Sequence, residues 1–531
     1  MKPRRLGKAL IACAIGVSAL VSYRSFGWDS VDAVNSLGLD LAAPDALILT
    51  HSLSALPRDL LTVSLARDVL REDFVFYYEQ GEDRLGLKGS LRRIAYEHEL
   101  HWGDELIRMV LDQPAEVALW RDPDGTLKHY AIALERTRLA RLFEEAGKVA
   151  LKDAQVRLAG ELRVGEDSVP VYAFEYAHGR TLLFAASGER MVILSHPGML
   201  YGGGADMQAD SASAAIVAAL LGPDPKARQV FRRQFQLPDG LPAGHSVAVK
   251  TDFLSFGYQP FFGALQALRF DFSKGAWQSQ VLIDGARLRP GGYDSSALWA
   301  ALPHGASACF SVPADWSAME PVLRRLGGDA SLLHTLPAQF AGPVAACWYG
   351  DSRLYTPVFV AQRATSALGA GAEAQLDGLF GALVGGESEH SADGGVQRWS
   401  RSVQTPAGPA TPTLAANGRT VVFSADAALV DRVLAVGRKQ APATADLLPD
   451  AGHTVGIVNP GALSRLVEKE AFEALPAASE PVLRGAAEAH LLPRLAALGK
   501  YPAYRMVVKT LPAGAAAKAP AWTPLEWQSV R

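Results

Sequence analysis

The sequence has little cysteine, little net charge and, after its first residues, no long apolar run. Its 531 residues include 3 cysteines, too few for a disulfide-rich secreted scaffold. The formal net charge is −3, which argues against a dedicated nucleic-acid surface. Arginine pairs such as Arg232-Arg233 sit in helical patterns and predict a solvated helix face. We therefore expect no nucleic-acid partner and, beyond the N-terminal segment, no further membrane span.

Motifs of known catalytic chemistry are also missing. The chain has no G-x-S-x-G elbow, and no S-x-x-K in a convincing context. Ser195 and His196 are adjacent, and adjacent residues rarely face each other as a nucleophile and its base must. The run Gly202-Gly203-Gly204 lacks a GK[ST] ending, and Asp206 nearby would repel a phosphate. These absences predict a non-enzymatic protein, and no cofactor is indicated.

The N-terminus has the pattern of a bacterial export signal. Four basic residues among the first eight precede a charge-free apolar run over residues 9–21. No clear A-x-A cleavage site precedes residues 23–26, which favours an uncleaved signal anchor at 1–25 and a linker at 26–44. The positive-inside rule then predicts a single-pass protein of the bacterial inner membrane with its body in the periplasm. A soluble periplasmic protein, released by cleavage, is the alternative.

Two cysteines, Cys309 and Cys347, lie in β-like runs of the second half. In an oxidising periplasm they can form a disulfide between neighbouring strands. Two buried free thiols are the alternative, because the sequence does not give the Cα separation that decides between them.

Matched landmarks occur in the same order in both halves of the chain. Residues 184–200 and 414–429 each hold an apolar run, a Gly turn, a second apolar run and a Ser that can cap a helix. The stretch A-G-H-S-V at 243–247 is echoed by A-G-H-T-V at 451–455. The sequence therefore predicts an internal duplication.

Hairpin patterns alternate with helical ones along the chain, which is typical of the α+β class with antiparallel sheets covered by helices. Residues 45–52 and 306–312 are predicted as equivalent strands, and 53–70 as a helix. Because 531 residues are too many for one ordinary core, we predict two tandem related domains, at 45–290 and 300–531.

Two histidines in a predicted helix are candidate metal ligands. His98 and His101 stand at i, i+3 spacing, which places both on one helix face, with Glu97 and Asp104 nearby. Their spacing is H-E-x-H rather than the H-E-x-x-H of metalloproteases, and His98 shares a stripe with apolar residues. A periplasmic hydrolase or metal-dependent enzyme using this region is one alternative function, and core or boundary histidines are the structural alternative.

His245 and His453 each follow a Gly at a predicted strand start and correspond between the two halves. A duplicated residue predicts an architectural role, such as a hydrogen bond to a turn. A ligand site shared by both halves is the alternative.

Three stretches resemble a family of uncharacterised bacterial envelope proteins. They are I-A-Y-E-H-E-L at 94–100, E-V-A-L-W-R-D-P-D-G at 116–125 and M-V-I-L-S-H-P-G-M-L at 191–200. The resemblance covers most of the chain after the anchor and implies no activity. Members are often encoded beside bacterial alpha-2-macroglobulin-like proteins, so it implies an envelope location and such a partner.

Together these observations predict a non-enzymatic binding or scaffold protein, anchored in the inner membrane and acting with another envelope protein. A carrier of a small or lipidic ligand is a further alternative.

Overall fold

The structure is a computed structural model, and part of the chain lies outside its described residues. It describes residues 35–53, 55–64, 66–68, 112–122, 127–135, 155–177, 180–202, 209–239, 242–254, 263–288, 294–318, 320, 324, 330–367, 369–405, 408–449, 451–475, 478, 480–511 and 519–530. The predicted anchor at 1–25 and the candidate ligands His98 and His101 fall outside them. No helix within these ranges is long and apolar enough to cross a membrane.

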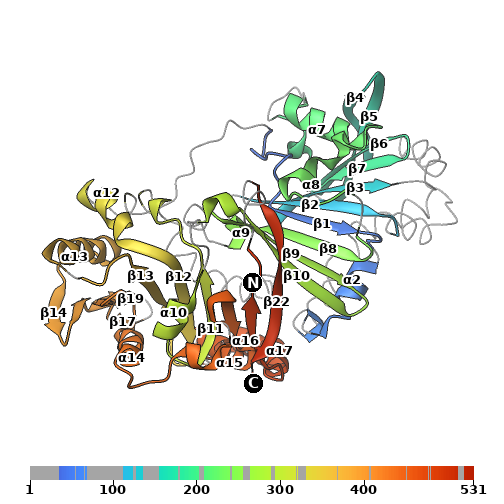
Figure 1. Cartoon of the computed structure of the whole chain (residues 1–531). Coiled ribbons are helices and arrows are strands. Elements are labelled where there is room, and N and C mark those ends of the chain that lie inside the picture. Colours follow the sequence, from blue (N-terminus) through green and yellow to red (C-terminus); the bar gives the residue numbers. More distant parts are fainter. Residues whose placement is uncertain are drawn as a thin grey trace. The chain divides into compact units, whose positions relative to one another are not determined.

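The described chain mixes helices with a large antiparallel sheet, so the predicted α+β class is confirmed (Figure 1). Its Cα atoms divide into two compact units. The first contains Gly27–Phe253 and Ala267–Ser279, and the second contains Leu254–Gln266 and Gln280–Arg531.

The first unit is built on antiparallel strands whose hydrogen-bonded order is β10-β9-β8-β1-β2-β3-β7-β6-β5-β4. The strands are β1 (Ala46–Thr50), β2 (Ala115–Arg121), β3 (Leu127–Glu135), β4 (Val156–Val164), β5 (Asp167–Ala177), β6 (Arg180–Ser187), β7 (Arg190–Leu194), β8 (His245–Lys250), β9 (Leu265–Ser273) and β10 (Ala276–Ile283). Both edges of β1 are paired, one with β2 and one with β8, and its residues are buried on both faces, which suits its near-continuous apolar run.

The second unit has a sheet in the order β22-β21-β20-β11-β12-β13-β19-β18-β15-β14. Its strands are β11 (Ala306–Val312), β12 (Phe340–Tyr349), β13 (Val358–Arg363), β14 (Glu389–Asp393), β15 (Val396–Ser400), β18 (Thr413–Asn417), β19 (Thr420–Ser424), β20 (Thr454–Val458), β21 (Ala503–Val507) and β22 (Ala521–Val530). A separate two-stranded ribbon is formed by β16 (Val403–Thr405) and β17 (Gly408–Ala410).

The two strand orders correspond position by position. β11 takes the place of β1, β20 that of β8, and the hairpin β18–β19 that of β6–β7. Both hairpins turn at a glycine with positive φ, +52° at Gly188 and +56° at Gly418. Glycine adopts that left-handed conformation without the steric cost that a side chain brings, which explains the Gly turn in both matched stretches.

Helices follow the strands where capping residues allow them to start. The first unit has α2 (Ala55–Leu60), α7 (Ser211–Leu221), α8 (Val230–Gln234) and α9 (Thr251–Leu254). The second has α10 (Ser296–Ala301), α12 (Ala330–Gln339), α13 (Ala370–Val384), α14 (Ala427–Gly437), α15 (Pro460–Ala474), α16 (Pro481–His490) and α17 (Leu492–Leu498). Asp210 caps α7 and Asp426 caps α14, each accepting a backbone N–H of the first turn.

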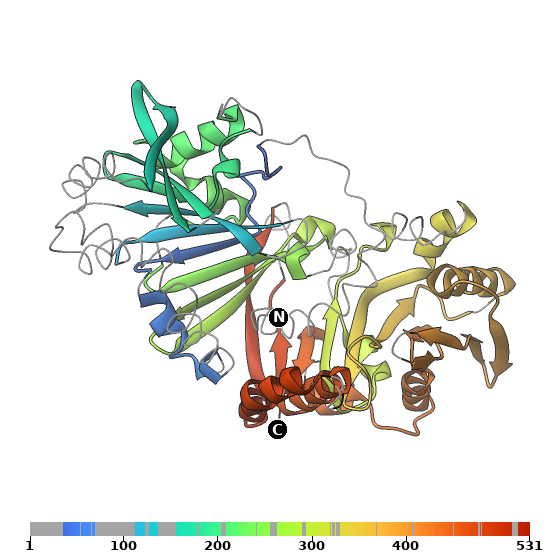
Figure 2. The ribbon, with the colours of Figure 1, turned by 180° about the vertical axis from the view of Figure 1, so that it is seen from behind.

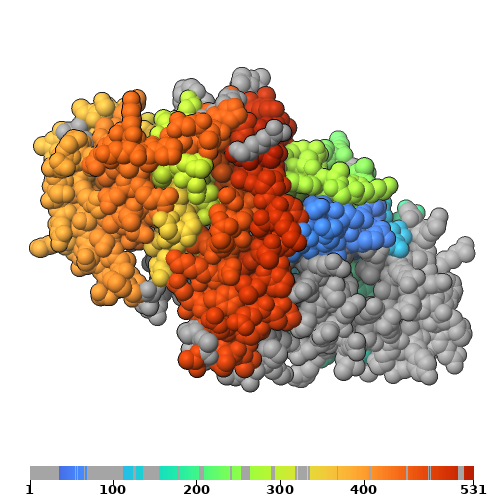
Figure 3. Space-filling view, turned by 90° about the horizontal axis from the view of Figure 1, so that it is seen from below, coloured from blue at the N-terminus to red at the C-terminus, as the bar shows by residue number. Residues whose placement is uncertain are grey.

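The C-terminal helices of the second unit lie together. Figure 2 shows α15, α16 and α17 beside one another, and the space-filling view shows the residues of this part of the chain, coloured orange-red, as one continuous surface (Figure 3). Asn459 starts α15 by accepting the N–H of Ala462, with Pro460 in the first turn.

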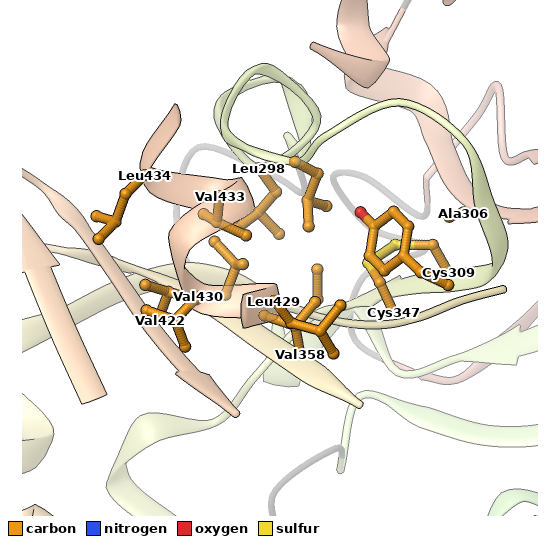
Figure 4. Close-up of a cluster of buried hydrophobic side chains, with 14 of the residues drawn as sticks. Leu298, Ala306, Cys309, Cys347, Val358, Val422, Leu429, Val430, Val433 and Leu434 are labelled. Carbon is orange, nitrogen blue, oxygen red and sulfur yellow. A yellow bond between two sulfur atoms is a disulfide. The ribbon is translucent and has the colours of Figure 1, made fainter. Parts of the chain in front are cut away.

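A hydrophobic core lies between α14, α10 and the strands of the second sheet (Figure 4). Leu429, Val430 and Val433 of α14 pack with Val358 and Val422 of the strands. Their spacing at i, i+1 and i+4 puts one helix face on the sheet.

Cys309 and Cys347 belong to the same core. They stand opposite each other on β11 and β12, both buried, and their Sγ atoms are joined as a disulfide in the structure (Figure 4). This placement favours the disulfide over two free thiols, and its formation in the protein stays a prediction.

We expect neither Cys309 nor Cys347 to react with an alkylating reagent in denatured, unreduced protein, and both to react after reduction. Peptide mass spectrometry of protein purified from an oxidising compartment checks this. Alkylation of either residue without prior reduction would instead show two buried thiols.

Candidate metal centre

Three side chains that can ligate a metal come together where β1 ends and β8 begins. His51 directly follows β1, His245 is the first residue of β8, and Asp59 lies on α2. One ligand atom from each lies within 4.8 Å of the others. Among the residues that the structure describes, no other three His, Cys, Asp or Glu side chains bring ligand atoms this close together.

His245 is held from both sides of its imidazole. The register pairs it with Thr50 of β1. Its Nδ1 atom lies 2.7 Å from Oγ1 of Thr50, and its Nε2 atom lies 3.1 Å from Oδ2 of Asp59. The His245 side chain is fully buried, with 0% of its surface exposed, so water does not substitute for these partners.

The contacts of Thr50 determine which nitrogen of His245 carries the proton. Oγ1 of Thr50 lies 2.7 Å from the carbonyl oxygen of Ser52 and accepts the Ser52 N–H at 3.1 Å. Since a carbonyl only accepts, the Thr50 hydroxyl donates its hydrogen to it, and Oγ1 must accept the hydrogen bond that Nδ1–H of His245 donates. In a neutral imidazole the lone pair is then on Nε2, and it faces the carboxylate of Asp59.

His51 is oriented in a similar way. Its Nδ1 atom lies 3.0 Å from the carbonyl oxygen of Gly244, so Nδ1 donates and Nε2 of a neutral ring keeps its lone pair. The centroids of the His51 and His245 rings are 4.7 Å apart. His51 is exposed, so the group extends from a buried imidazole to the solvent.

Asp59 is placed by the early end of α2. The sequence predicts one helix over 53–70, but α2 ends at Leu60, and the backbone becomes helical again only at Ser64 and at 66–68. The backbone N–H and the hydroxyl of Thr62 both donate to the carbonyl oxygen of Asp59, at 3.1 and 2.6 Å, and close a turn there. A threonine that bonds a nearby carbonyl competes with helix continuation, which explains the difference.

Burial and charge favour the deprotonated forms of both inner side chains. Burial lowers the pKa of His245 below its ordinary 6.5 and His51 lowers it further, while Asp59 acts in the opposite direction. Burial acts to raise the pKa of Asp59, but the hydrogen bonds and charges of His245 and Arg58 bring it below its ordinary 3.8. A neutral imidazole and a carboxylate are the forms that bind metals.

The strand registers allow the two units to be aligned residue by residue. Ala248 on β8 pairs with Leu47 on β1, and Gly456 on β20 pairs with Phe310 on β11. Ala248 and Gly456 directly follow the matched stretches A-G-H-S-V and A-G-H-T-V. Leu47 and Phe310 are therefore equivalent.

The second unit does not repeat the ligand set. Counting onward from the equivalent residues, Pro313 stands in the place of Thr50 and Ala314 in the place of His51. His453 is kept, but the hydroxyl that orients it and the second imidazole are not. Since the strand order is repeated without these side chains, the fold does not require them, which weighs against a purely architectural role for the group.

Comparison with known proteins identifies the family. A profile of the family described as "Uncharacterized protein conserved in bacteria (DUF2138)" matches residues 24–527. The chain belongs to this family. The resemblance to an uncharacterised bacterial family is thereby confirmed, and the family's description assigns no activity.

A relative and a solved structure are similar to this DUF2138 chain to different degrees. "Uncharacterized protein YfaA" from Escherichia coli (strain K12) is 33% identical over 525 residues, which cover 93% of this chain and 91% of the relative. "Structure of crystal form III of TP0453" covers 77% of this chain and 99% of that one, with 8% identity and a TM-score of 0.20, too low to support an argument about the fold. The predicted association with alpha-2-macroglobulin-like proteins is tested by neither.

Elsewhere in the DUF2138 chain, Ser195 and His196 have structural roles. Ser195 Oγ accepts the N–H of Tyr130 on β3 at 2.9 Å. His196, not Ser195, caps the short helix η4 (Pro197–Met199), and its Nδ1 accepts the N–H of Gly198 at 2.9 Å. The prediction that Ser195 caps a helix is therefore wrong, because the next residue, His196, makes the cap.

The cap made by His196 should be sensitive to acid. Burial lowers the pKa of His196 and of His129, and their rings lie 6.2 Å apart. With a folded pKa below the unfolded value of 6.5, this stabilisation is present above that pH and is lost as the pH falls toward the folded pKa. For the buried His129 we expect the unfolding free energy to drop by up to about 1.4 kcal/mol per pH unit, and for the exposed His196 by a smaller amount, because solvent screens its charge.

Urea unfolding at about pH 7 and about pH 5.5 measures this drop. His196→Asn keeps an acceptor at the cap but removes the titration, so its drop should be smaller than that of the wild type. An equal drop in both proteins would assign the acid sensitivity to other groups.

Sequence reasoning missed His51, Asp59 and Thr50. Asp59 and His245 are 186 residues apart, and no helix or strand period connects them. One signal was present, because His245 was identified as a histidine at a strand start. The predicted solvated face at Arg232 is also wrong, because that side chain is buried against Glu116.

Proposed function

We propose that the chain is a two-domain protein of the bacterial envelope that binds a divalent transition-metal ion through His51, Asp59 and His245. The observation that supports this best is the 3.1 Å contact between Nε2 of His245 and Oδ2 of Asp59. A neutral imidazole oriented by Thr50 has no proton to place between these atoms. Ligands held at about 2.0–2.2 Å from a tetrahedral ion lie about 3.4 Å apart, close to the spacing of this pair.

The donor set indicates the class of metal. Two imidazole nitrogens and one carboxylate oxygen suit Zn²⁺ and Fe²⁺, whereas Ca²⁺ and Mg²⁺ prefer oxygen ligands. Both imidazoles donate their Nδ1 proton to an oxygen, Thr50 Oγ1 and the Gly244 carbonyl, as metal-binding histidines usually do. Zinc is therefore the ion to test first.

Three protein ligands leave a coordination position open, and His51 lies at the surface. A metal there can polarise a ligand or lower the pKa of a bound water. We assign binding and no reaction, because no general base has been placed beside the group. The enzyme alternative at His98 and His101 concerned other residues, which lie outside the described ranges.

Metal analysis of the full-length protein, purified without a His tag in detergent, tests the proposal. We expect close to one zinc per chain, and less than about a tenth in His245→Asn, because bound zinc co-purifies with its ligands in place. The matched control is His453→Asn, which removes the equivalent histidine of the second unit and should leave the zinc content unchanged. Wild-type protein without metal, or equal losses in both variants, would contradict the proposal.

The proposal also states that the two domains are related by a tandem duplication. It is supported by the shared strand order, the matched A-G-H stretches and the paired glycine turns at Gly188 and Gly418. Expression of residues 284–531 alone, which begin directly after β10, tests it, since an independent domain should unfold cooperatively on its own.

The envelope location is supported by the export pattern of residues 1–25. With an uncleaved anchor, a protease added to spheroplasts should digest the body while the chain's N-terminus, identified by mass spectrometry, stays intact. Crosslinking in cells should capture another envelope protein, for which the family resemblance suggests an alpha-2-macroglobulin-like one. Failure to capture any envelope protein would contradict the proposed scaffold role and would leave the proposed metal binding unaffected.

A further inference from the structure

The sheet of the second unit ends at a strand with one unpaired edge. β14 is hydrogen-bonded to β15, and among the described residues no other strand pairs with it. Figure 1 shows β14 at the outer end of that sheet. All five of its residues are exposed. An edge strand of this kind presents a row of backbone N–H and C=O groups to which a further strand can add.

The turn of the β14–β15 hairpin determines which backbone groups face outward. Asp393 pairs with Val396, and the two glycines between them have φ values of +55° and +81°, positive as a type I′ turn requires. In such a hairpin Asp393 and Val396 exchange both of their hydrogen bonds, and bonded and non-bonded pairs then alternate along the strand. The N–H and C=O groups of His390 and Ala392 therefore point away from β15.

The corresponding edge of the first unit is interrupted. β4 takes the place of β14 in the strand order, and its register with β5 shifts between Leu158 and Gly160. Irregularities of this kind are a common way of preventing a further strand from pairing with an edge. The register of β14 with β15 runs from Glu389 to Asp393 without a shift, so β14 keeps a regular edge.

The charged side chains of β14 indicate which kind of strand fits. Glu389 and Asp393 are four residues apart and lie on one face of the sheet, where Arg398 of β15 forms an ion pair with Asp431. Two copies of β14 paired antiparallel about Ser391 would place Glu389 of each copy opposite Asp393 of the other, and like charges directly opposite each other are destabilising. A strand with basic residues in those two positions gains opposite-charge pairs instead. The edge thus fits a basic segment of another protein and not a second copy of this chain.

We propose that β14 is the docking strand for an extended basic segment of another envelope protein, which adds to the sheet beside it. The segment pairs antiparallel with β14, bonds the outward backbone groups of His390 and Ala392, and places basic side chains opposite Glu389 and Asp393. Backbone hydrogen bonds supply the affinity, and the spacing of the basic residues, four apart, supplies the specificity. The inference names the contact surface for the scaffold role of the proposed function, on which it rests, and it does not depend on the metal centre.

A short fluorescent peptide tests the site on the full-length protein in detergent at constant ionic strength. It carries lysine at its first and fifth positions and valine, threonine and valine between them, so that the valines lie opposite His390 and Ala392. We expect saturable binding by fluorescence anisotropy. Binding should be at least tenfold weaker when both valines are N-methylated, because the methyl groups remove the N–H donors that pair with β14. Absence of saturable binding, or equal binding of the two peptides, overturns the proposal.

Substitutions in β14 assign the binding to its edge. Ala392→Pro removes an outward N–H, a change that an edge strand tolerates, and it should weaken the peptide at least tenfold. Ala392→Thr keeps that N–H and should bind the peptide as the wild type does. Glu389→Lys with Asp393→Lys should prefer a peptide with glutamate in place of its lysines. If Ala392→Pro loses its wild-type circular dichroism, the N-methylated peptide on the wild-type protein decides the same point; a folded Ala392→Pro that binds like the wild type overturns the proposal.

Crosslinking in cells distinguishes failure of this edge from failure of the scaffold role. The wild type and Ala392→Thr should capture an envelope protein that Ala392→Pro does not capture. Equal capture by all three would keep the scaffold role and overturn β14 as its contact surface. Capture by none would contradict the scaffold role itself, and this proposal with it.

Discussion

Replacing Asp59 with asparagine should weaken zinc binding by more than the roughly 10–100-fold that loss of an outer-shell partner costs. The amide keeps the shape of the carboxylate but removes its charge. It can also turn its NH₂ toward Nε2 of His245 and donate to the lone pair that would bind the metal. Competition with a chromophoric chelator measures the affinity. Wild-type protein at zinc concentrations about 100 times Kd should gain about 2.7 kcal/mol of stability, and Asp59→Asn should gain almost none.

Thr50 provides the control for this prediction. Thr50→Val removes the oxygen that accepts from Nδ1 of His245, and it should cost about 10–100-fold in zinc affinity. Thr50→Ser keeps that oxygen and should restore most of the affinity. Zinc affinities of Asp59→Asn and Thr50→Val equal to that of the wild type would show that the three side chains form a hydrogen-bonded cluster and not a metal site.

Arg232→Met should destabilise the first unit by about 3–5 kcal/mol, because it leaves the Glu116 carboxylate buried without its partner. The Arg232 and Glu116 side chains are 8% and 11% exposed, and Nε and Nη2 of the guanidinium both donate to one carboxylate oxygen, while Nη1 donates to the carbonyl oxygen of Pro238 at 3.5 Å. The free energy of unfolding is obtained from urea denaturation, from the transition that belongs to the first unit.

The double substitution Glu116→Leu with Arg232→Met distinguishes the cost of losing the ion pair from the cost of leaving the Glu116 carboxylate buried and unpaired. Replacing a buried pair by apolar side chains of similar volume is often neutral, so the double variant should regain most of the stability. Arg233→Met, at an exposed neighbour, should change stability by no more than about 0.5 kcal/mol. A double variant as unstable as Arg232→Met would mean that the helix and not the pair is being disrupted.

The strands were the most predictable part of the molecule. The strand predicted at 306–312 coincides with β11, and that predicted at 45–52 contains β1. Alternating or continuous apolar runs between glycine turns determine strands locally, so they can be read from a sequence. The end of α2 was less predictable, because it depends on two hydrogen bonds that Thr62 makes to one carbonyl.

The candidate metal centre was not predictable in the same way. Its side chains come from the end of one strand, the start of another and a short helix, and only the pairing of β1 with β8 brings them together. Burial of Arg232 likewise depends on Glu116, 116 residues away. The spacing of apolar residues along the sequence shows which residues lie on the same face of a helix or strand. It does not show which distant residues pack against that face.

The pairing of β1 with β8 also sets an order of events during synthesis. Thr50 and His245 are separated by 195 residues, so the chain must be nearly half made before they can meet. A chain exported before it folds would cross the membrane with its metal ligands apart. Under the proposed function, the ion is then acquired in the compartment where the first unit folds, and the metal supply of that compartment determines which ion the protein carries.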